Sequence, residues 1–435
     1  MKRAILLLAT MLAPLTIASA GAQTVAITGG TLAIGDGSAP IEGGTVVIAD
    51  GRILAAGRGV AVPAGAQVID TTGKWVAAGL VSAVTDLSLV DADGVSESND
   101  AGARSAPFKA AIDVSVAINP AGVKLGNERL GGVTRALVTP NAGGSIFAGQ
   151  GAVIDLGADP DAVMRARAFQ FVELGEDGGR LAGGSRPAAY ASLRDAFQQA
   201  QDYRRNPAAF DGRSRDALVT RGDAEALLRV LDGQVPLMVH VERASDIRTV
   251  LGLTRDYPRL KLVLVGVTEG WLVAREIAAA RVPVIAAALA DLPASFESLA
   301  ATESNVGRMR AAGVKVALMG GGGQQGDHVI RQYAGNLVAI TRVPGATGLD
   351  WGQAFAAITS GPAEALGMGA DIGSLRPGRR ADVVLWDGDP LELSSAPVAI
   401  WIDGRPQPMT SRQTELRDRY LTPTEGALPK AYERR

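Results

Sequence analysis

The sequence predicts an α/β fold, a (β/α)8 TIM-like barrel flanked by a small β-sandwich that is built from both chain ends. In the middle of the chain, segments rich in Val, Ile and Leu alternate with helical segments, which is typical of a parallel sheet covered on both faces. Short alternating segments separated by turn residues precede and follow this region. Repeated βα units of this length favour a barrel, and a doubly wound sheet is the alternative.

Composition limits the class of protein. Of 435 residues, 47% are hydrophobic, which is ample for a large core, and a barrel of about 250 residues counts as one domain. A charged fraction of 20% and a net charge of -2 give no electrostatic reason to expect nucleic acid or an anionic membrane as a partner. The absence of cysteine excludes disulfides and lipid attachment to cysteine.

The N-terminus has the pattern of a cleaved secretory signal. Lys2 and Arg3 precede an apolar run at residues 4–17, and small residues follow. A membrane anchor is the alternative, but the run is shorter than the about 20 residues that a span requires, and Pro14 interrupts it. We therefore predict a signal peptide at residues 1–22, a mature chain without a membrane span, and a periplasmic location.

Two separate segments predict the β-sandwich, residues 23–78 and residues 369–409. In the first, Asp50-Gly51 lies between two alternating segments, which is a strong hairpin signal. In the second, residues 398–402 read as a strand that a turn follows. Residues 410–435 are dense in Arg, Glu and Pro and predict an exposed tail.

Residues 79–368 are predicted to form the barrel. Residues 157–222, rich in Arg and Gln, are interpreted as an insertion that contains a solvated amphipathic helix, and a role as a lid is left open. The predicted strands are residues 133–139, 151–156, 235–241, 260–267, 282–286 and 314–319, and the predicted helices are residues 224–231, 245–256, 271–280 and 306–312.

The segment 73–86, which reads Gly-Lys-Trp-Val-Ala-Ala-Gly-Leu-Val-Ser-Ala-Val-Thr-Asp, resembles the start of the barrel in the amidohydrolase superfamily. There the pattern is G-x-x-V-x-P-G-L-I-D-x-H-x-H, and residues 373–386 resemble a closing element of the same superfamily. The resemblance, especially to the imidazolonepropionase-like group, covers almost the whole mature chain. It implies a hydrolase in which zinc or another divalent metal activates water against a carbon–nitrogen bond and an aspartate moves the proton.

The resemblance also implies a set of metal ligands, most of which this chain replaces. Val84 and Asp86 occupy the positions of the first two histidines, and His240 matches the histidine of the fifth strand. The sixth strand ends without histidine, and the eighth is followed by glycines at 320–323 in place of an aspartate. The glycine run is read as a collapsed loop, with an anion cradle as the alternative. The fourth-strand ligand is not located, although residues 171–176 are a candidate region.

The candidate catalytic residues are Asp86, His240 and Glu242, and the candidate metal ligands are His240, Asp86 and Glu269. If this site is active, the expected cofactor is zinc or another divalent metal. If it is not active, no cofactor is expected. The second histidine of the chain, His328, is predicted to be an exposed surface residue.

Two functions follow from the sequence. The first is an exported hydrolase of non-peptide carbon–nitrogen bonds with a degenerate metal site. The second is a catalytically inactive binding protein, or the partner subunit of an active paralogue. In both cases we expect a small-molecule ligand in the barrel mouth, and a homodimer or a heterodimer with a related amidohydrolase.

Overall fold

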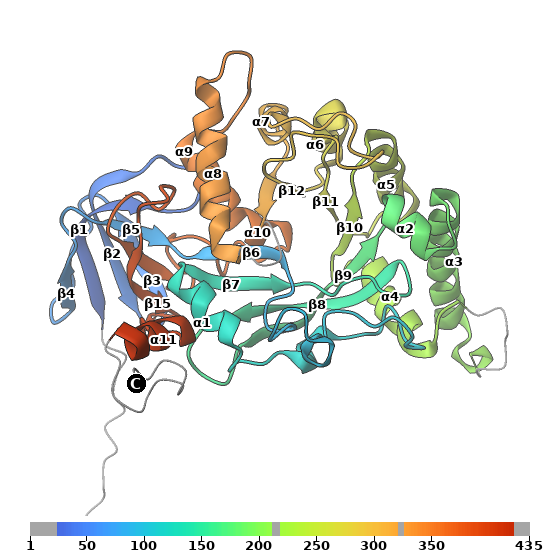
Figure 1. The fold of residues 1–435 in the computed structure, drawn as a ribbon, viewed down its shortest axis with the longest axis horizontal. Helices are drawn as coiled ribbons and strands as arrows, with labels where there is room; N and C mark the ends of the chain where they lie inside the picture. Colours follow the sequence, from blue (N-terminus) through green and yellow to red (C-terminus); the bar gives the residue numbers. More distant parts are fainter. Residues whose placement is uncertain (1–23, 211–217, 321–325, 422–435) are drawn as a thin grey trace, which may run out of the picture.

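The computed structural model describes residues 24–210, 218–320 and 326–421. The predicted signal peptide, most of the glycine run and the end of the tail lie outside the described residues. Within the described part of the chain, no helix is long and apolar enough to cross a membrane. Two sheets organise the molecule, and Figure 1 shows them side by side, with the strands from both chain ends on one side and the barrel strands on the other.

Sheet A contains strands from both chain ends, as the sequence predicts. β5 (Trp75–Ala78) pairs with β1 (Val25–Ala33) on one side and with β14 (Val383–Trp386) on the other, so the two ends are joined through hydrogen-bonded strands. The strand order is β16-β15-β14-β5-β1-β2-β3, with β4 paired to β1. The remaining strands of sheet A are β2 (Ile41–Ala49), β3 (Arg52–Gly57), β4 (Gln67–Asp70), β15 (Pro397–Ile402) and β16 (Arg405–Pro406).

The hairpin predicted at Asp50-Gly51 is confirmed. Ala49 pairs with Arg52, and the two residues between them have φ values of 50° and 75°. Positive φ at both central positions defines the type I′ turn, whose twist matches that of the strands it joins.

Sheet B is the predicted barrel. Its strand order is β13-β12-β11-β10-β9-β8-β7-β6, and each of the eight strands contributes a residue to one cluster of buried side chains, which therefore fills the barrel interior. The strands are β6 (Leu80–Thr85), β7 (Val133–Val138), β8 (Phe147–Asp155), β9 (Val163–Glu173), β10 (Leu237–Val241), β11 (Leu262–Gly266), β12 (Val284–Ala287) and β13 (Val316–Met319).

Helices cover the barrel from β9 onward, as the alternating pattern predicts. The long helices among them are amphipathic, for example α5, which buries Ile247, Val250 and Leu251. The helices are α1 (Val123–Leu130), α2 (Gly175–Leu181), α3 (Arg186–Arg205), α4 (Arg221–Leu231), α5 (Ala244–Asp256), α6 (Ala274–Ala280), α7 (Asn305–Ala311), α8 (Ile330–Ala339), α9 (Trp351–Ala357), α10 (Ser360–Ala365) and α11 (Arg412–Leu421).

One strand of the barrel departs from the repeating βα pattern. β8 runs antiparallel to both β7 and β9. The connections at 139–146 and 156–162 explain the reversal, because a parallel crossover needs about a dozen residues or more. Hairpins therefore replace two βα units on this side of the barrel (Figure 1).

The interpretation of residues 157–222 as an insertion is wrong in part, because β9 lies in this stretch and is a barrel strand. The first half of β9 is mostly exposed and carries Arg165 and Arg167, whereas Ala168–Val172 is buried. Because the exposed half of β9 is rich in polar residues, its composition is like that of a solvated insertion, although the segment is a barrel strand. α3 is the amphipathic helix expected here, with a buried face formed by Ala189, Leu193, Ala196, Phe197 and Ala200.

The seam of the barrel lies between β6 and β13, which are neighbours without strand pairing. The N–H of Val81 instead donates to the carbonyl of Ile358 at 2.9 Å, and α10 packs on both strands. The chain after α9 thus fills the seam and satisfies a backbone group of β6.

A buried ion cluster connects sheet B to sheet A. The Arg135 side chain on β7 is fully buried, and its Nε and Nη2 donate to both carboxylate oxygens of Asp382 at 2.7 and 2.6 Å. Nη2 also donates to Asp403 at 2.8 Å, and Asp155 lies 3.6 Å from Nη1. Burial alone lowers the pKa of Arg135, but the attraction of these three carboxylates raises it above its ordinary value.

Candidate functional site

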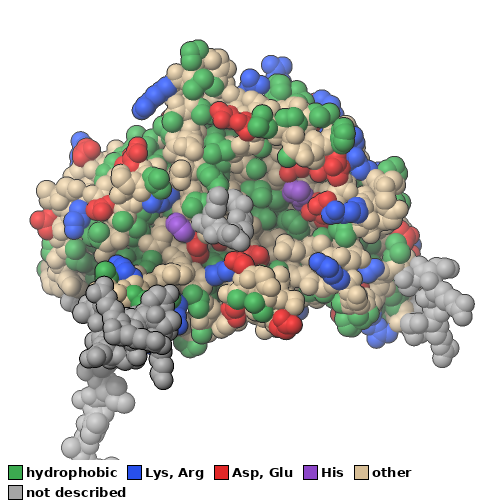
Figure 2. Space-filling model, in the orientation of Figure 1, with side chains coloured by type: hydrophobic (Ala, Val, Ile, Leu, Met, Phe, Trp, Pro, Cys, Tyr) green, Lys and Arg blue, Asp and Glu red, His purple; other side chains and the backbone are tan. Residues whose placement is uncertain are grey.

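The predicted site residues lie at one end of the barrel. Asp86 directly follows β6, His240 lies in β10, Glu242 directly follows β10, and Glu269 comes shortly after β11. The carboxyl ends of parallel barrel strands meet at one face, where barrel enzymes carry their active sites. Figure 2 shows the two histidine side chains on either side of a central hollow, in which hydrophobic side chains gather.

His240 is held between two carboxylates on neighbouring strands. Its Nδ1 lies 2.7 Å from Oε1 of Glu173, the last residue of β9, and its Nε2 lies 3.0 Å from Oε1 of Glu242. The second oxygen of Glu242 accepts a hydrogen bond from the N–H of Thr268 at 2.7 Å. Both ring nitrogens therefore face carboxyl oxygens, and this arrangement favours the protonated imidazole.

The electrostatics of this group follow from its burial. Burial alone lowers the pKa of His240, but the hydrogen bonds to Glu173 and Glu242 raise it well above its ordinary value. Burial alone raises the pKa of Glu242, but the interactions with His240 and with the Thr268 N–H lower it below its ordinary value. Burial raises the pKa of Glu173. These contacts therefore favour the charged form of His240 between Glu173 and Glu242.

These residues do not fit a metal centre. Both nitrogens of His240 contact carboxyl groups, so a metal at either nitrogen would have to displace a proton and the hydrogen bond to Glu173 or to Glu242. The carboxylate of Glu269 accepts hydrogen bonds from the N–H groups of Ala244 and Ala300 at 3.0 and 3.1 Å, so it holds two loops together. Over residues 24–210, 218–320 and 326–421, no group of three or more His, Cys, Asp or Glu side chains is arranged to hold a metal ion.

The structure does not bring the side chains of the predicted metal ligands His240, Asp86 and Glu269 together. The backbone brings their elements to one face of the barrel, but each side chain is directed to different partners. His240 and Glu242 are in contact, and Asp86 lines a separate cavity.

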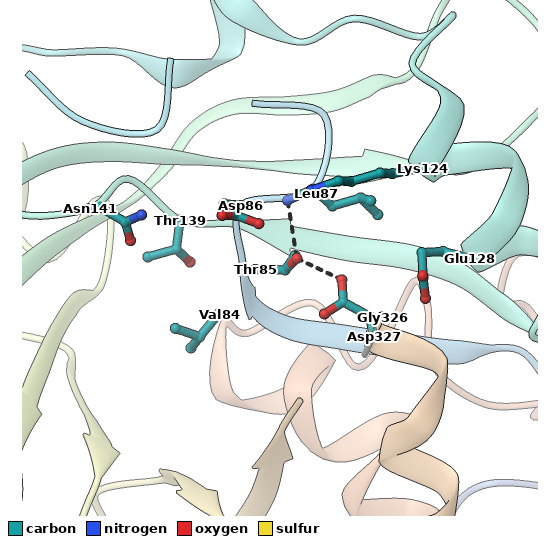
Figure 3. A pocket seen from close by; sticks show the side chains of 10 residues that line it. All are labelled: Val84, Thr85, Asp86, Leu87, Lys124, Glu128, Thr139, Asn141, Gly326 and Asp327. Carbon is teal, nitrogen blue, oxygen red and sulfur yellow. Dashed lines mark hydrogen bonds between the residues drawn. The ribbon is translucent and has the colours of Figure 1, made fainter. Parts of the chain in front are cut away.

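This cavity lies where β6, β7, α1 and the segment after β13 converge, and it has a volume of about 260 Å³. Figure 3 shows its lining side chains, among them the carboxylates of Asp86, Glu128 and Asp327. Asp86 forms no side-chain hydrogen bond or ion pair with any residue that the structure describes. Lys124 also lines the cavity, but its Nζ is paired with Asp93 at 2.7 Å.

Asp327 is a buried carboxyl group of the cavity. Its residue is 8% exposed, and its Oδ2 accepts a hydrogen bond from Thr85 Oγ1 at 2.6 Å (Figure 3). Burial raises the pKa of Asp327 to about 6, and the nearby charges of Glu128 and Asp86 add to the effect. A carboxyl group with this pKa changes protonation state close to neutral pH, as a general acid or base must.

His328, which was predicted to be an exposed surface residue, is half-exposed and is held by Glu128. Its Nδ1 lies 3.0 Å from Oε2 of Glu128, the same oxygen accepts its backbone N–H at 2.7 Å, and its side chain is 38% exposed. The pKa of His328 is raised by this hydrogen bond. The interaction directs Glu128 of α1 toward the segment after β13.

Two strands end in strained backbone at this face. Val84 has a φ of 57° at an irregular position of β6, and Val267, just after β11, has a φ of 60°. Left-handed backbone is rare for β-branched residues and costs about 1–3 kcal/mol. Residues with such strained backbone are often found at functional sites. Asn305 holds Val267 in place by donating to its carbonyl at 2.9 Å.

Sequence reasoning missed Glu173, Glu128 and Asp327. Glu173 lies inside the region 171–176, which was the candidate region for the fourth-strand ligand. Its position in the sequence could therefore have identified it as a candidate site residue. Asp327 lies a few residues beyond the end of β13, and the glycine run between them hid its relation to the last strand. Nothing in the sequence singled out Glu128.

Comparison with known proteins agrees with this description. The model of the Amidohydrolase family matches residues 220–411. The amidohydrolase tasK of Hapsidospora irregularis is 25% identical over 388 residues, which are 79% of this chain but 37% of that protein. The chain thus spans little more than a third of the length of this curated relative.

Solved structures share the fold. A Thermotoga maritima MSB8 amidohydrolase superposes with a TM-score of 0.77 at 23% identity, covering 88% of this chain and 99% of that one. An adenosine deaminase from Xanthomonas campestris, solved with bound zinc, gives a TM-score of 0.51 at 18% identity and covers 92% and 97% of the two chains.

The fold and the position of the candidate site define an α/β-barrel protein with a flanking β-sheet and a polar site at the carboxyl ends of its strands. Residues 220–411 match the Amidohydrolase family, and the solved structures share the fold of the chain.

Proposed function

We propose that the chain is a hydrolase of carbon–nitrogen bonds other than peptide bonds, and that carboxyl groups rather than a metal activate the water. The observation that carries the proposal is Asp327, a buried carboxyl group in a cavity at the carboxyl ends of the barrel strands. The match of residues 220–411 to the Amidohydrolase family supports the reaction class. The arrangement of His240, Glu173 and Glu242 speaks against metal as the reagent.

The chain's own groups suffice for the proton transfers. Ionised Asp327, oriented by Thr85, accepts a proton from water while the water oxygen bonds to the substrate carbonyl carbon. When the carbon–nitrogen bond breaks, protonated Asp327 returns that proton to the leaving nitrogen, so the carboxyl group ends in its starting state. Asp86 faces the same cavity as a second carboxylate. Its charge helps to keep the pKa of Asp327 high.

The test is hydrolysis by the purified mature chain after treatment with a chelator. A panel of N-acyl amines, ureas and cyclic amides is assayed by amine release, with Asp327→Asn as the variant and Asp100→Asn, an exposed carboxylate between β6 and α1, as the matched control. We expect activity that survives chelation, falls at least about 100-fold in Asp327→Asn, and is retained in the control. Activity that requires added metal, or that Asp327→Asn leaves intact, contradicts the mechanism.

A binding protein is the second candidate, and the occupied nitrogens of His240 favour it. In this case the mature chain hydrolyses nothing in the panel, yet one of the compounds raises its melting temperature. Mixing with an active paralogue and measuring the mass by light scattering tests the partner-subunit version and also reveals a homodimer.

We also propose that the protein is exported to the periplasm, on the pattern of residues 1–22. N-terminal sequencing of the protein from a periplasmic extract tests this proposal. A mature N-terminus near residue 21 or 23 supports it, and an intact Met1 in the cytoplasmic fraction contradicts it.

A further inference from the structure

A second cavity lies on the opposite face of α1 from the first. Lys124 and Glu128, four residues apart, line the first cavity, whereas Gly126 and Arg129, three residues apart, line the second. The second cavity has a volume of about 660 Å³ and lies where α1, the turn after β8 and the start of α11 meet. Figure 1 shows α11 beside α1. The described residues that line this cavity include none of the proposed catalytic groups.

Arg129 is buried in the wall of this cavity without an acidic partner. The residue is 6% exposed, and its Nη1 donates to the carbonyl of Leu156 at 2.9 Å. Its Nε is buried and has no hydrogen-bond partner, and its Nη2 forms no hydrogen bond with any residue that the structure describes. Burial lowers the pKa of Arg129, and no described carboxylate opposes this effect. The described part of the chain thus leaves this positive charge uncompensated.

Other buried arginines of the chain have more partners. Arg135 lies among three carboxylates, as described above. Arg331 donates to three backbone carbonyl groups, those of Pro390, Glu392 and Leu393. An uncompensated buried charge is costly, so a guanidinium with one carbonyl partner beside a cavity indicates that a ligand supplies the missing anion.

The free nitrogen of Arg129 lies beside the cavity wall. A Cβ added at Gly126 would lie 3.9 Å from Arg129 Nη2 and 3.7 Å from the Cβ of Ser411, and all three residues line the cavity. The N-terminus of α1 faces the same space, because its N-cap Gly122 provides no side-chain cap and lines the cavity together with Val123. The positive end of a helix favours an anion, so two separate elements favour negative charge here.

The rest of the lining limits which anion fits. Much of the wall is apolar, formed by Pro120, Ala121, Val123 and Pro160. The exposed charged residues of the lining are Asp159, Arg412 and Glu415. Two of these three are acidic, which disfavours an ion of higher charge such as phosphate. A single negative charge attached to an apolar group matches the lining best.

We propose that this cavity binds a small organic carboxylate with an apolar body. The carboxylate group accepts hydrogen bonds from Arg129 and lies near the N-terminus of α1, and the apolar body contacts Val123 and Pro160. The site is separate from the cavity of Asp327, so the inference is independent of the proposed hydrolase activity.

The experiment is calorimetric titration of the purified mature chain with three probes. 4-Methylpentanoate has the proposed chemistry, 4-methylpentanamide has the same shape without the charge, and inorganic phosphate has charge without an apolar body. We expect the carboxylate to bind at least about tenfold more tightly than either of the others, because a charge-assisted hydrogen bond to a buried guanidinium contributes that much. No binding of the carboxylate, or equal binding of the amide or of phosphate, overturns the proposal.

Variants locate the binding. Arg129→Met should lower the affinity for 4-methylpentanoate at least about tenfold. Arg342→Met removes the same charge at an exposed position outside the cavity and should leave the affinity unchanged.

A second variant tests the cavity with the guanidinium in place. Gly126→Leu extends a side chain into the space beside Arg129 Nη2, and leucine is a better helix former than glycine. It should abolish binding while the melting temperature stays at or above that of the wild type, so it tests the site even where Arg129→Met fails to fold. A folded Gly126→Leu variant with wild-type affinity places the carboxylate elsewhere and overturns the proposal.

Discussion

Replacing Arg135 by methionine tests whether the buried ion cluster ties the barrel to sheet A. The guanidinium is fully buried and forms a bidentate pair with Asp382, whose side chain is 5% exposed. Removing one partner of a buried pair costs about 3–5 kcal/mol, because the other charge stays buried without compensation. Asp382 meets this condition, whereas Asp403, at 31% exposure, can be hydrated. We therefore expect Arg135→Met to lower the free energy of unfolding by about 4 kcal/mol at pH 7.5.

The size of the loss should depend on pH in a defined direction. Burial already raises the pKa of Asp155 to about 6, and the attraction of Arg135 opposes this rise. Without Arg135, the clustered carboxyl groups protonate more readily, and a neutral carboxyl group no longer requires a cation. The difference between the variant and the wild type should therefore shrink between pH 7.5 and pH 5.

Urea unfolding followed by circular dichroism and tryptophan fluorescence measures the difference. Arg380→Met is the matched control, because this arginine pairs with Asp371 and Asp403 at 3.1 and 3.0 Å but its side chain is 33% exposed. Such a pair contributes about 1 kcal/mol or less. If Arg135→Met proves no more destabilising than Arg380→Met, the buried cluster does not stabilise the junction and the reasoning is refuted.

Three further predictions concern the barrel mouth. Incubation with zinc followed by exhaustive dialysis should leave no stoichiometric metal, because both nitrogens of His240 are engaged; about one zinc per chain, lost in His240→Ala, would contradict this. His240→Gln should cost about 3 kcal/mol of stability at pH 6, the contribution of two charge-assisted hydrogen bonds. Because the pKa of His240 is raised in the folded state, its contribution to stability is complete below pH 6.5 and is lost as the pH rises through the folded-state pKa. Because the pKa of Glu242 is lowered, its contribution to stability is present above pH 4.5 and is lost as the pH falls. The cost of His240→Gln should thus fall in alkaline solution, and a cost that grows there would refute the assignment. Val84→Gly relieves left-handed strain and should stay within about 1 kcal/mol of the wild type, whereas Val81→Gly, at a fully buried position of the same strand, should cost about 3 kcal/mol; equal costs in urea unfolding would show that Val84 is not strained.

The sequence was most informative where local pattern and burial agree. The hairpin at Asp50-Gly51 followed from turn chemistry alone, and the βα units after residue 223 followed from long apolar strands between amphipathic helices. β9 was missed because half of it is exposed and carries arginines, so its composition indicated a solvated segment and not a strand of the barrel. Tertiary contacts, not local pattern, make it a barrel strand.

The sequence named residues that the structure places at one face of the barrel, but it did not specify their contacts. His240 and Glu242 were found because a strand places alternate residues on one face, which brings their side chains into contact. The partner Glu173 comes from a neighbouring strand, and Asp327 reaches Thr85 from the other end of the chain. Such contacts depend on strand order and loop path, which a single sequence does not specify.

Because both chain ends build sheet A, the order of synthesis separates its halves in time. β1 to β5 leave the ribosome early, but β14, which pairs with β5, is made only after the whole barrel. Until then β5 has an open edge, and such an edge can pair with strands of other molecules. A nascent or truncated chain that ends before Val383 retains this open edge. Pairing of β14 with β5 therefore completes sheet A and also removes an edge at which the chain can aggregate.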